Sequence, residues 1–215
     1  WYRGEYHREG AARGLGAAED LWAPGVFRCD IAAGEVFELT ASADVEAPGP
    51  SAVAVVGTAR ARAADLADLA GATDEVDRVL ALAADQFIVQ TPTGPTAVAG
   101  YPWFGEWSRD LFTSYEGLFL CTGRTDEGRE VFTRAAATVS EGMLANTADV
   151  GTLEYNTIDA TLWFVHALHR HIDVTGDVAL GVELADTLVD ILVAHRDGTR
   201  FGIGLDDATG LLRGG

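Results

Sequence analysis

The chain has 215 residues, of which 48% are hydrophobic, and a formal net charge of −18 in which every basic residue is an arginine. So acidic a chain is a poor partner for nucleic acid or for an anionic membrane, because phosphate groups would be repelled. The apolar content is sufficient for a real core, which excludes an intrinsically disordered protein.

Cysteine usage and the absence of long apolar runs indicate a cytoplasmic setting. No stretch approaches the run of about 20 apolar residues that a membrane helix needs. No apolar signal segment follows the opening WYRGEYHREG. Cys29 and Cys121 stand far apart, so a disulfide framework is not expected. A first residue other than Met and the abrupt ending LLRGG suggest a piece of a longer polypeptide, whose oligomeric state the sequence does not indicate.

The first part of the chain is expected to be β-structured. Residues 25–31 and 35–41 carry apolar, strand-favouring side chains around a turn at Ala33-Gly34. A further apolar run covers residues 51–57. These segments predict that residues 1–58 are the end of an N-terminal antiparallel β-sandwich domain. Residues 59–73 are rich in alanine and predict a linker helix with a break at Gly71.

From residue 74 onward the apolar spacing is helical. It predicts helices at about 74–90, 110–122, 126–142, 157–174 and 177–195. Two connections, TGRTDEG and TGDVALG, are tight turns of similar composition. In these turns Gly123 and Gly176 suit the left-handed position that ends one helix, and Asp126 and Asp177 suit the cap of the next.

The other connections, at residues 91–109, 143–156 and 197 to the end, are long. Short turns alternating with long loops predict antiparallel helical hairpins, with the long loops gathered at one end. The hairpin length of roughly fifty residues indicates a solenoid or a closed ring. The fold class is therefore predicted to be mainly α.

The long loops carry the unusual residues. The first contains YPWFGEWSRD, in which aromatic side chains crowd beside Arg109 and Asp110. Aromatic faces match the apolar faces of a pyranose ring, and charged groups can form paired hydrogen bonds with sugar hydroxyls. If the loops converge, they form a carbohydrate pocket. The candidate substrate-binding residues are Trp103, Trp107, Arg109, Asp110, Asn146, Tyr155, Asn156, Asp159 and Trp163.

Several of the candidates also have a purely structural interpretation. Arg109 and Asp110 suit a salt bridge in which Asp110 caps the helix that follows. Asp159 suits a helix start, and Tyr155 suits packing. Asn156 and Thr157 suit caps of the same helix, and Trp103 and Phe104 suit packing over the end of the helical core.

Three histidines lie close together in sequence, but their spacing does not favour a metal site. His166, His169 and His171 do not share one helix face, and no acidic residue lies at ligand spacing. We therefore expect surface histidines, no metal and no organic cofactor. Walker, Rossmann and nucleophile-elbow motifs are absent from the sequence.

Three motifs in order, AGYPWFGEWSRDLF, GLFLCTGRTDEGREVF and YNTIDATLWFVHAL, resemble the C-terminal region of glycogen debranching enzymes, the amylo-α-1,6-glucosidase family. The opening residues resemble the end of the β-sandwich domain that precedes it in bacterial and archaeal members. The resemblance implies an (α/α)6 toroid, of which residues 74–215 would supply the first five helices. Three positions depart from the family's usual residues. Ser108 stands in place of Gly, Glu116-Gly117 in place of Pro-Gly, and Ala145 in place of Pro.

The resemblance also implies site roles. In glucoamylase-like relatives the Arg–Asp pair of W-x-R-D binds hydroxyls of the terminal glucose, which here falls on Arg109 and Asp110, with Trp107 as a wall. Glycoside hydrolysis needs a general acid and a second carboxylate. The resemblance places both beyond Gly215, so Asp110 and Asp159 are expected to bind glucose rather than transfer protons.

The leading hypothesis is a debranching-type glycoside hydrolase that acts, with inversion, on α-1,6 branch points of glycogen or a related α-glucan. Another α-glucoside or trehalose-type hydrolase of the same fold is the first alternative. A non-catalytic carbohydrate-binding fragment is the second, and a helical scaffold that docks a protein is the third.

Overall fold

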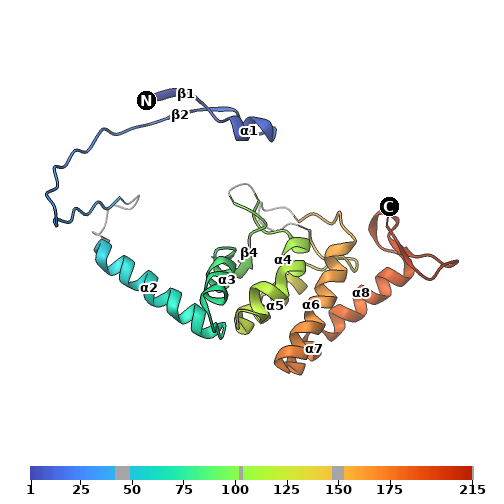
Figure 1. The fold of residues 1–215 in the computed structure, drawn as a ribbon. Helices are drawn as coiled ribbons and strands as arrows, with labels where there is room; N and C mark the ends of the chain where they lie inside the picture. The colour runs from blue at the N-terminus through green and yellow to red at the C-terminus, as the bar shows by residue number, and fades with distance from the viewer. Residues whose placement is uncertain (42–48, 102–103, 147–152, 215) are drawn as a thin grey trace. The chain divides into compact units, whose positions relative to one another are not determined.

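The computed structural model describes residues 1–41, 49–101, 104–146 and 153–214. The chain divides into two units, Trp1–Val56 and Gly57–Gly215, and each is taken by itself. Helices dominate the second unit. Figure 1 shows three of them side by side, namely α4 (Ser108–Tyr115), α5 (Thr125–Ala136) and α6 (Asp159–Thr175). The described residues include no helix with the length and apolarity to cross a bilayer.

The first unit contains one short antiparallel hairpin. Strands β1 (Tyr2–Tyr6) and β2 (Ala18–Leu21) pair, and α1 (Arg8–Ala12) lies between them. The turn at Ala33-Gly34 is present, with φ of 91° at Gly34, but the predicted strands at 25–31 and 35–41 are not formed. Their apolar side chains lie exposed. Strand-favouring residues form a stable strand only when they pair with another strand or pack on a core, and in the described part of the chain these segments do neither. The β-sandwich assignment stays a prediction.

The strand predicted at 51–57 is wrong, because this segment opens α2 (Ala52–Leu69). The Ser51 hydroxyl accepts a hydrogen bond from the Ala54 amide at 3.3 Å, as a helix-capping serine does. The alanine-rich sequence that follows extends the helix, and this outweighs the β preference of the valines. The linker helix is therefore longer at its start than the predicted 59–73 and ends at Leu69, two residues before the left-handed Gly71.

The helix predicted at 74–90 ends early. Asp74 caps α3 (Glu75–Asp85) by accepting a hydrogen bond from the Asp77 amide at 2.9 Å. The chain then forms an unpredicted hairpin of β3 (Ile88–Thr91) and β4 (Gly94–Ala97). Gly94, with φ of 119°, supplies the backbone conformation of the turn, and β-branched residues flank it.

The remaining helices begin near their predicted positions, but several end elsewhere. Helix α4 (Ser108–Tyr115) continues into a π-helical turn η1 (Glu116–Leu120), α5 (Thr125–Ala136) stops short of the predicted residue 142, and α6 follows (Asp159–Thr175). The last predicted helix is broken at Leu184 into α7 (Val178–Glu183) and α8 (Ala185–Asp197). A short 3-10 turn η2 (Arg200–Gly202) and a hairpin of β5 (Gly204–Leu205) and β6 (Leu212–Arg213) complete the described chain.

The two tight turns behave largely as predicted. Gly123 and Gly176 have φ of 73° and 74°, so both adopt the left-handed conformation that ends a helix. The Asp177 carboxylate accepts the Leu180 amide at 3.0 Å and caps α7. Asp126 does not cap α5, since it lies inside the first turn and Arg124 occupies the cap position without a side-chain bond.

The core between α4, α5 and α6 contains a cluster of aromatic rings among aliphatic side chains. Phe112 stacks on Phe132 with 5.5 Å between ring centroids and meets Phe164 edge-on at 5.2 Å. Tyr115 lies 4.6 Å from Phe132, and all four rings are buried. Packed rings of this size hold the first turns of α4 and α6 in a fixed relation, and these turns carry the candidate site.

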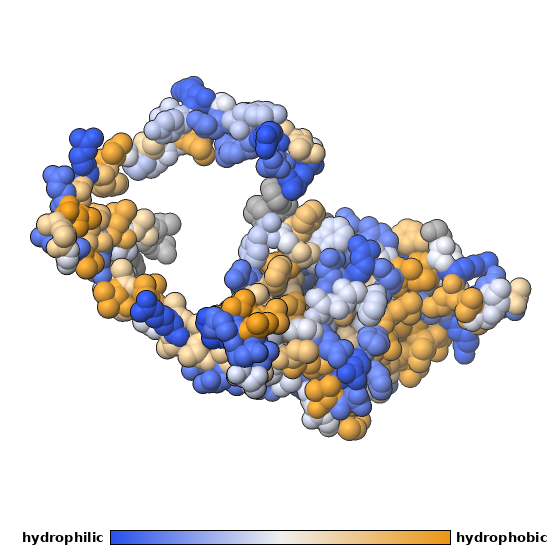
Figure 2. Space-filling model, viewed as in Figure 1, coloured by the Kyte–Doolittle hydropathy of each residue, from blue (hydrophilic) through white to orange (hydrophobic). Residues whose placement is uncertain are grey.

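Apolar side chains on the last helices remain exposed. Val182, Val189 and Leu192 are 72%, 55% and 66% accessible. Figure 2 shows hydrophobic residues gathered over α7 and α8, on the right of the molecule.

Candidate functional site

The loop before α4 and the loop before α6 meet at one end of the helices. The Ser108 amide donates to the Asn146 carbonyl at 2.8 Å, and the Ser108 hydroxyl donates to the Ala145 carbonyl. Arg109 Nη1 lies 3.5 Å from Asp159 Oδ2. The Arg109–Asp159 pair joins residues that are fifty positions apart in the chain, and Ser108 bonds directly to Ala145.

Asn146 organises the second loop from inside. The residue is only 2% exposed, and its backbone amide donates a hydrogen bond to the Glu154 carbonyl at 2.6 Å. Its Nδ2 donates to Asn156 Oδ1 at 2.8 Å. Asn156 is exposed, so the buried asparagine fixes the side chain of the accessible one.

A buried carboxylate anchors the first loop. Glu106 is 8% exposed and forms an ion pair with Arg134 of α5, with 2.8 Å between Glu106 Oε2 and Arg134 Nη1. The Thr96 hydroxyl of β4 donates to the same oxygen at 2.5 Å. Arg134 also donates to the Pro95 carbonyl at 3.3 Å. Glu106 therefore connects the loop to the β3–β4 hairpin and to α5, a role that its sequence context did not predict.

The Arg109–Asp159 ion pair lines a cavity of about 580 Å³, a volume within the range of small-molecule sites. The Arg109 and Asp159 side chains are 46% and 41% exposed, so they keep hydrogen-bonding capacity free. An ion pair this accessible contributes only about 0–1 kcal/mol to stability. The cavity is lined by Arg109, Asn156, Thr157, Ile158, Asp159, Phe201, Ile203 and Gly214.

Asp110 faces a different cavity. That cavity, of about 290 Å³, lies between α4 and the β3–β4 hairpin and is lined mainly by apolar groups, including Phe87 and Ala97. Arg109 thus pairs with Asp159 and not with Asp110, and the proposed structural salt bridge within W-x-R-D is not formed. Neighbouring residues on a helix point about 100° apart, which separates the two side chains.

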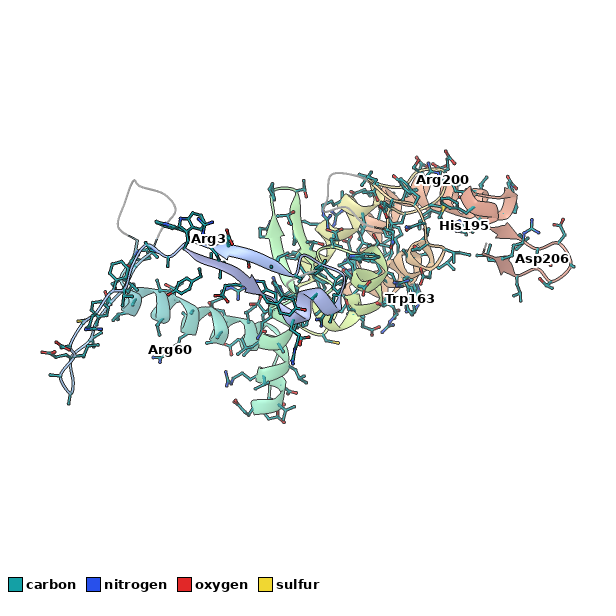
Figure 3. All side chains as sticks on the ribbon, turned by 90° about the horizontal axis from the view of Figure 1, so that it is seen from above. Arg3, Arg60, Trp163, His195, Arg200 and Asp206 are labelled. Carbon is teal, nitrogen blue, oxygen red and sulfur yellow. The ribbon has the colours of Figure 1, made fainter. Side chains whose placement is uncertain are left out.

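The aromatic candidates in the described part of the chain do not form a common wall around the Arg109 cavity. Trp107 is half-buried just before α4. Trp163 meets His166 edge-on, 5.4 Å between ring centroids, and Figure 3 shows it apart from Arg200. Phe104 is 51% exposed, so it does not plug the core. Trp103 lies outside the described residues.

Tyr155 packs, as its structural interpretation predicted. Its hydroxyl donates to the Thr138 carbonyl at 2.7 Å, and its ring lies under the Arg200 guanidinium at 4.3 Å. Phe201, the next residue, reaches the cavity. Neither Arg200 nor Phe201 was predicted from the sequence, since an isolated Thr-Arg-Phe-Gly carries no periodic pattern and Phe beside Gly is only a weak turn signal.

Helix capping does not account for the acidic residues. The cap position of α4 is Trp107 and that of α6 is Ile158, and neither helix has a side-chain capping bond. Asp110 and Asp159 instead lie in the first turns, where a carboxylate interacts favourably with the helix dipole. Asn156 and Thr157 do not cap α6 either.

At the opposite end, one of the predicted surface histidines is buried. His171 is 1% exposed, and its Nδ1 shares a 2.8 Å hydrogen bond with the Tyr115 hydroxyl. Burial lowers the pKa of His171 and raises that of Tyr115. Nearby, the Leu180 amide and Arg129 hold the pKa of Asp177 below its ordinary value. His166 and His169 are exposed.

Across the described part of the chain, no group of three or more His, Cys, Asp or Glu side chains could hold a metal ion.

Comparison with known proteins identifies relatives of this chain. Residues 82–215, well over half of the chain, match the family described as amylo-alpha-1,6-glucosidase. The chain is also 34% identical over 89 residues to the glycogen debranching enzyme of Saccharomyces cerevisiae. That alignment covers 39% of this chain and 6% of the yeast protein, so the chain spans only a small part of its relative's length.

Proposed function

Because the chain belongs to the amylo-alpha-1,6-glucosidase family, we propose that the complete protein is a glycoside hydrolase that cuts α-1,6-glucosidic branch points of glycogen or a related α-glucan. The named yeast relative is a glycogen debranching enzyme, which supports this substrate class. A cytoplasmic location, an α-glucan partner and the first part of an (α/α)6 toroid belong to the same proposal.

The observation that carries the proposal is the accessible Arg109–Asp159 pair at the cavity. A guanidinium offers only donors and a carboxylate only acceptors, so together they can hold a hydroxyl that both donates and accepts. Asn156 adds an amide at the same cavity. This set suits a neutral polyhydroxylated ligand, to which the net charge of −18 is no obstacle.

The pair is proposed to bind and orient a glucose unit rather than to transfer protons. The Asp159 carboxylate already faces a guanidinium, which fits hydroxyl binding better than proton delivery to a leaving oxygen. The buried Asn146 is a positioning residue that holds Asn156. An inverting reaction would need a general acid and a general base about 6.5–9.5 Å apart. We assign neither role to Asp110 or Asp159.

The test is hydrolysis of a branched limit dextrin by the complete protein, with Arg109→Gln and Asp159→Asn as variants. Each substitution removes charged hydrogen bonds to the substrate, so each should lower kcat/KM by about tenfold to a hundredfold. Arg78→Gln is the matched control, because it removes an arginine from an exposed ion pair on α3. Unchanged activity in both site variants would refute the binding role.

Further arms of the same assay separate the alternatives. Faster hydrolysis of maltose or trehalose than of limit dextrin would indicate another α-glucoside hydrolase. Binding without turnover would indicate a carbohydrate-binding module. The α-anomer of glucose as first product would contradict inversion. Asp110→Asn tests whether the carboxylate at the second cavity also contacts substrate.

A further inference from the structure

Phe201 has an unusual combination of backbone conformation and exposure. Its φ and ψ are 60° and 26°, in the left-handed region that bulky residues rarely occupy. Its side chain is 65% exposed, so burial does not compensate for the strain. For folding alone, glycine would suit this position better.

The strained residue is nevertheless held firmly in place by its neighbours. The Arg200 guanidinium lies 4.3 Å above the Tyr155 ring and donates to the Ser140 hydroxyl at 2.9 Å. The Thr199 hydroxyl donates to the Glu141 carbonyl at 2.9 Å. The turn closes on itself because the Thr199 amide donates to the Ile203 carbonyl at 2.7 Å. Figure 3 labels Arg200 in this C-terminal part of the chain.

This turn places an aromatic ring at the same cavity as the polar pair. Phe201, Arg109, Asp159 and Asn156 all line it, so one apolar face and several hydrogen-bonding groups surround one space. A hexose has the matching chemistry, with an apolar face of C–H groups and a rim of hydroxyls. Among the described residues, the other aromatic candidates, Trp107, Tyr155 and Trp163, are not part of its lining.

We propose that Phe201 is a stacking platform for one glucose unit of the α-glucan, held for that role by Arg200 and Thr199. The inference rests on the proposed function and adds a specificity-determining residue to it. The backbone strain is maintained because the ring must point into the cavity, where a fixed ring binds with less loss of conformational entropy than a mobile one.

The test compares Phe201→Gly, Phe201→Trp and the complete unmodified protein for binding of maltotetraose by calorimetry. Phe201→Gly removes the ring and relieves the backbone, so binding should weaken by about tenfold while the unfolding temperature stays equal or rises. Phe201→Trp keeps an aromatic face and should bind within about threefold of the unmodified protein. Leu211→Ala, which changes a 69% exposed residue outside the cavity lining, is the control and should change nothing.

The outcomes separate the two proposals. Equal binding by Phe201→Gly and the unmodified protein overturns the stacking role and leaves the proposed function standing. If both Phe201 variants lose binding and also have a lower unfolding temperature, the role of Phe201 is structural, and the stacking proposal is again overturned. No binding of maltotetraose by the unmodified protein overturns the stacking role, whereas the proposed function is judged by hydrolysis of limit dextrin.

Discussion

Replacing Gly128 with alanine tests the packing that fixes α4 against α5. A Cβ atom at this position would lie 2.2 Å from the Tyr115 hydroxyl oxygen and 3.2 Å from Phe119 Cβ. Tyr115 is fully buried, and its hydroxyl is hydrogen-bonded to His171 Nδ1 at 2.8 Å. The hydroxyl would have to retreat by about 1.2 Å to reach an ordinary contact distance of 3.4 Å, and the Tyr115 ring already packs against Phe119 and Phe132.

The magnitude follows from three contributions. Overpacking of a rigid core costs about 1–3 kcal/mol. Loss of the Tyr115–His171 hydrogen bond adds about 1 kcal/mol. Alanine is about 1 kcal/mol better than glycine inside a helix, which offsets part of this loss. We therefore expect Gly128→Ala to lower the free energy of unfolding by about 1–3 kcal/mol.

The assay is urea unfolding of the complete protein followed by tryptophan fluorescence. Gly117→Ala is the matched control, since a Cβ there would meet no atom within 4 Å and should leave stability unchanged or slightly higher. In a Tyr115→Phe background the hydroxyl is absent, so the penalty of Gly128→Ala should shrink. If Gly128→Ala is as stable as Gly117→Ala, the steric argument is wrong. It is also wrong if the stability penalty of Gly128→Ala is as large in the Tyr115→Phe background as in the unmodified protein.

Two further predictions concern buried charged and titratable groups. Glu106→Gln leaves the mostly buried Arg134 without its counter-charge, so the free energy of unfolding should fall by about 1–3 kcal/mol. Glu75→Gln, which changes an exposed ion pair, is the control. An equal loss of stability in both variants would contradict the stabilising role of the buried Glu106–Arg134 pair. Because burial lowers the pKa of His171, the unfolded chain takes up a proton near pH 6.5 while the folded chain stays neutral. Stability should therefore fall as the pH drops from about 6.5 towards the lower folded pKa, and His171→Gln should flatten this slope in urea titrations between about pH 7.5 and 5.5. The exposed His169→Gln should keep the slope, and an unaltered slope in the His171 variant would show that another group is responsible.

The sequence by itself determined the local features of this protein. Left-handed Gly123 and Gly176, the Asp177 cap and the starts of the main helices follow from contacts within one turn, which residue type and spacing encode. The motif order also carried the family assignment, which the match over residues 82–215 confirms. The strand propensity of residues 25–41 was not enough to form strands, because a strand needs a partner strand, and the spacing of apolar residues within one segment does not provide it.

Only the tertiary structure decided which distant groups meet. The sequence offered Asp110 as the partner of Arg109, but the packing of α4 on α6 brings Asp159 to it and turns Asp110 towards another cavity. Phe201, in a segment without periodic pattern, reaches the same cavity as Arg109. The physical reason is that side-chain direction and helix packing select long-range partners, and neither is fixed by the order of residues within a single helix or loop.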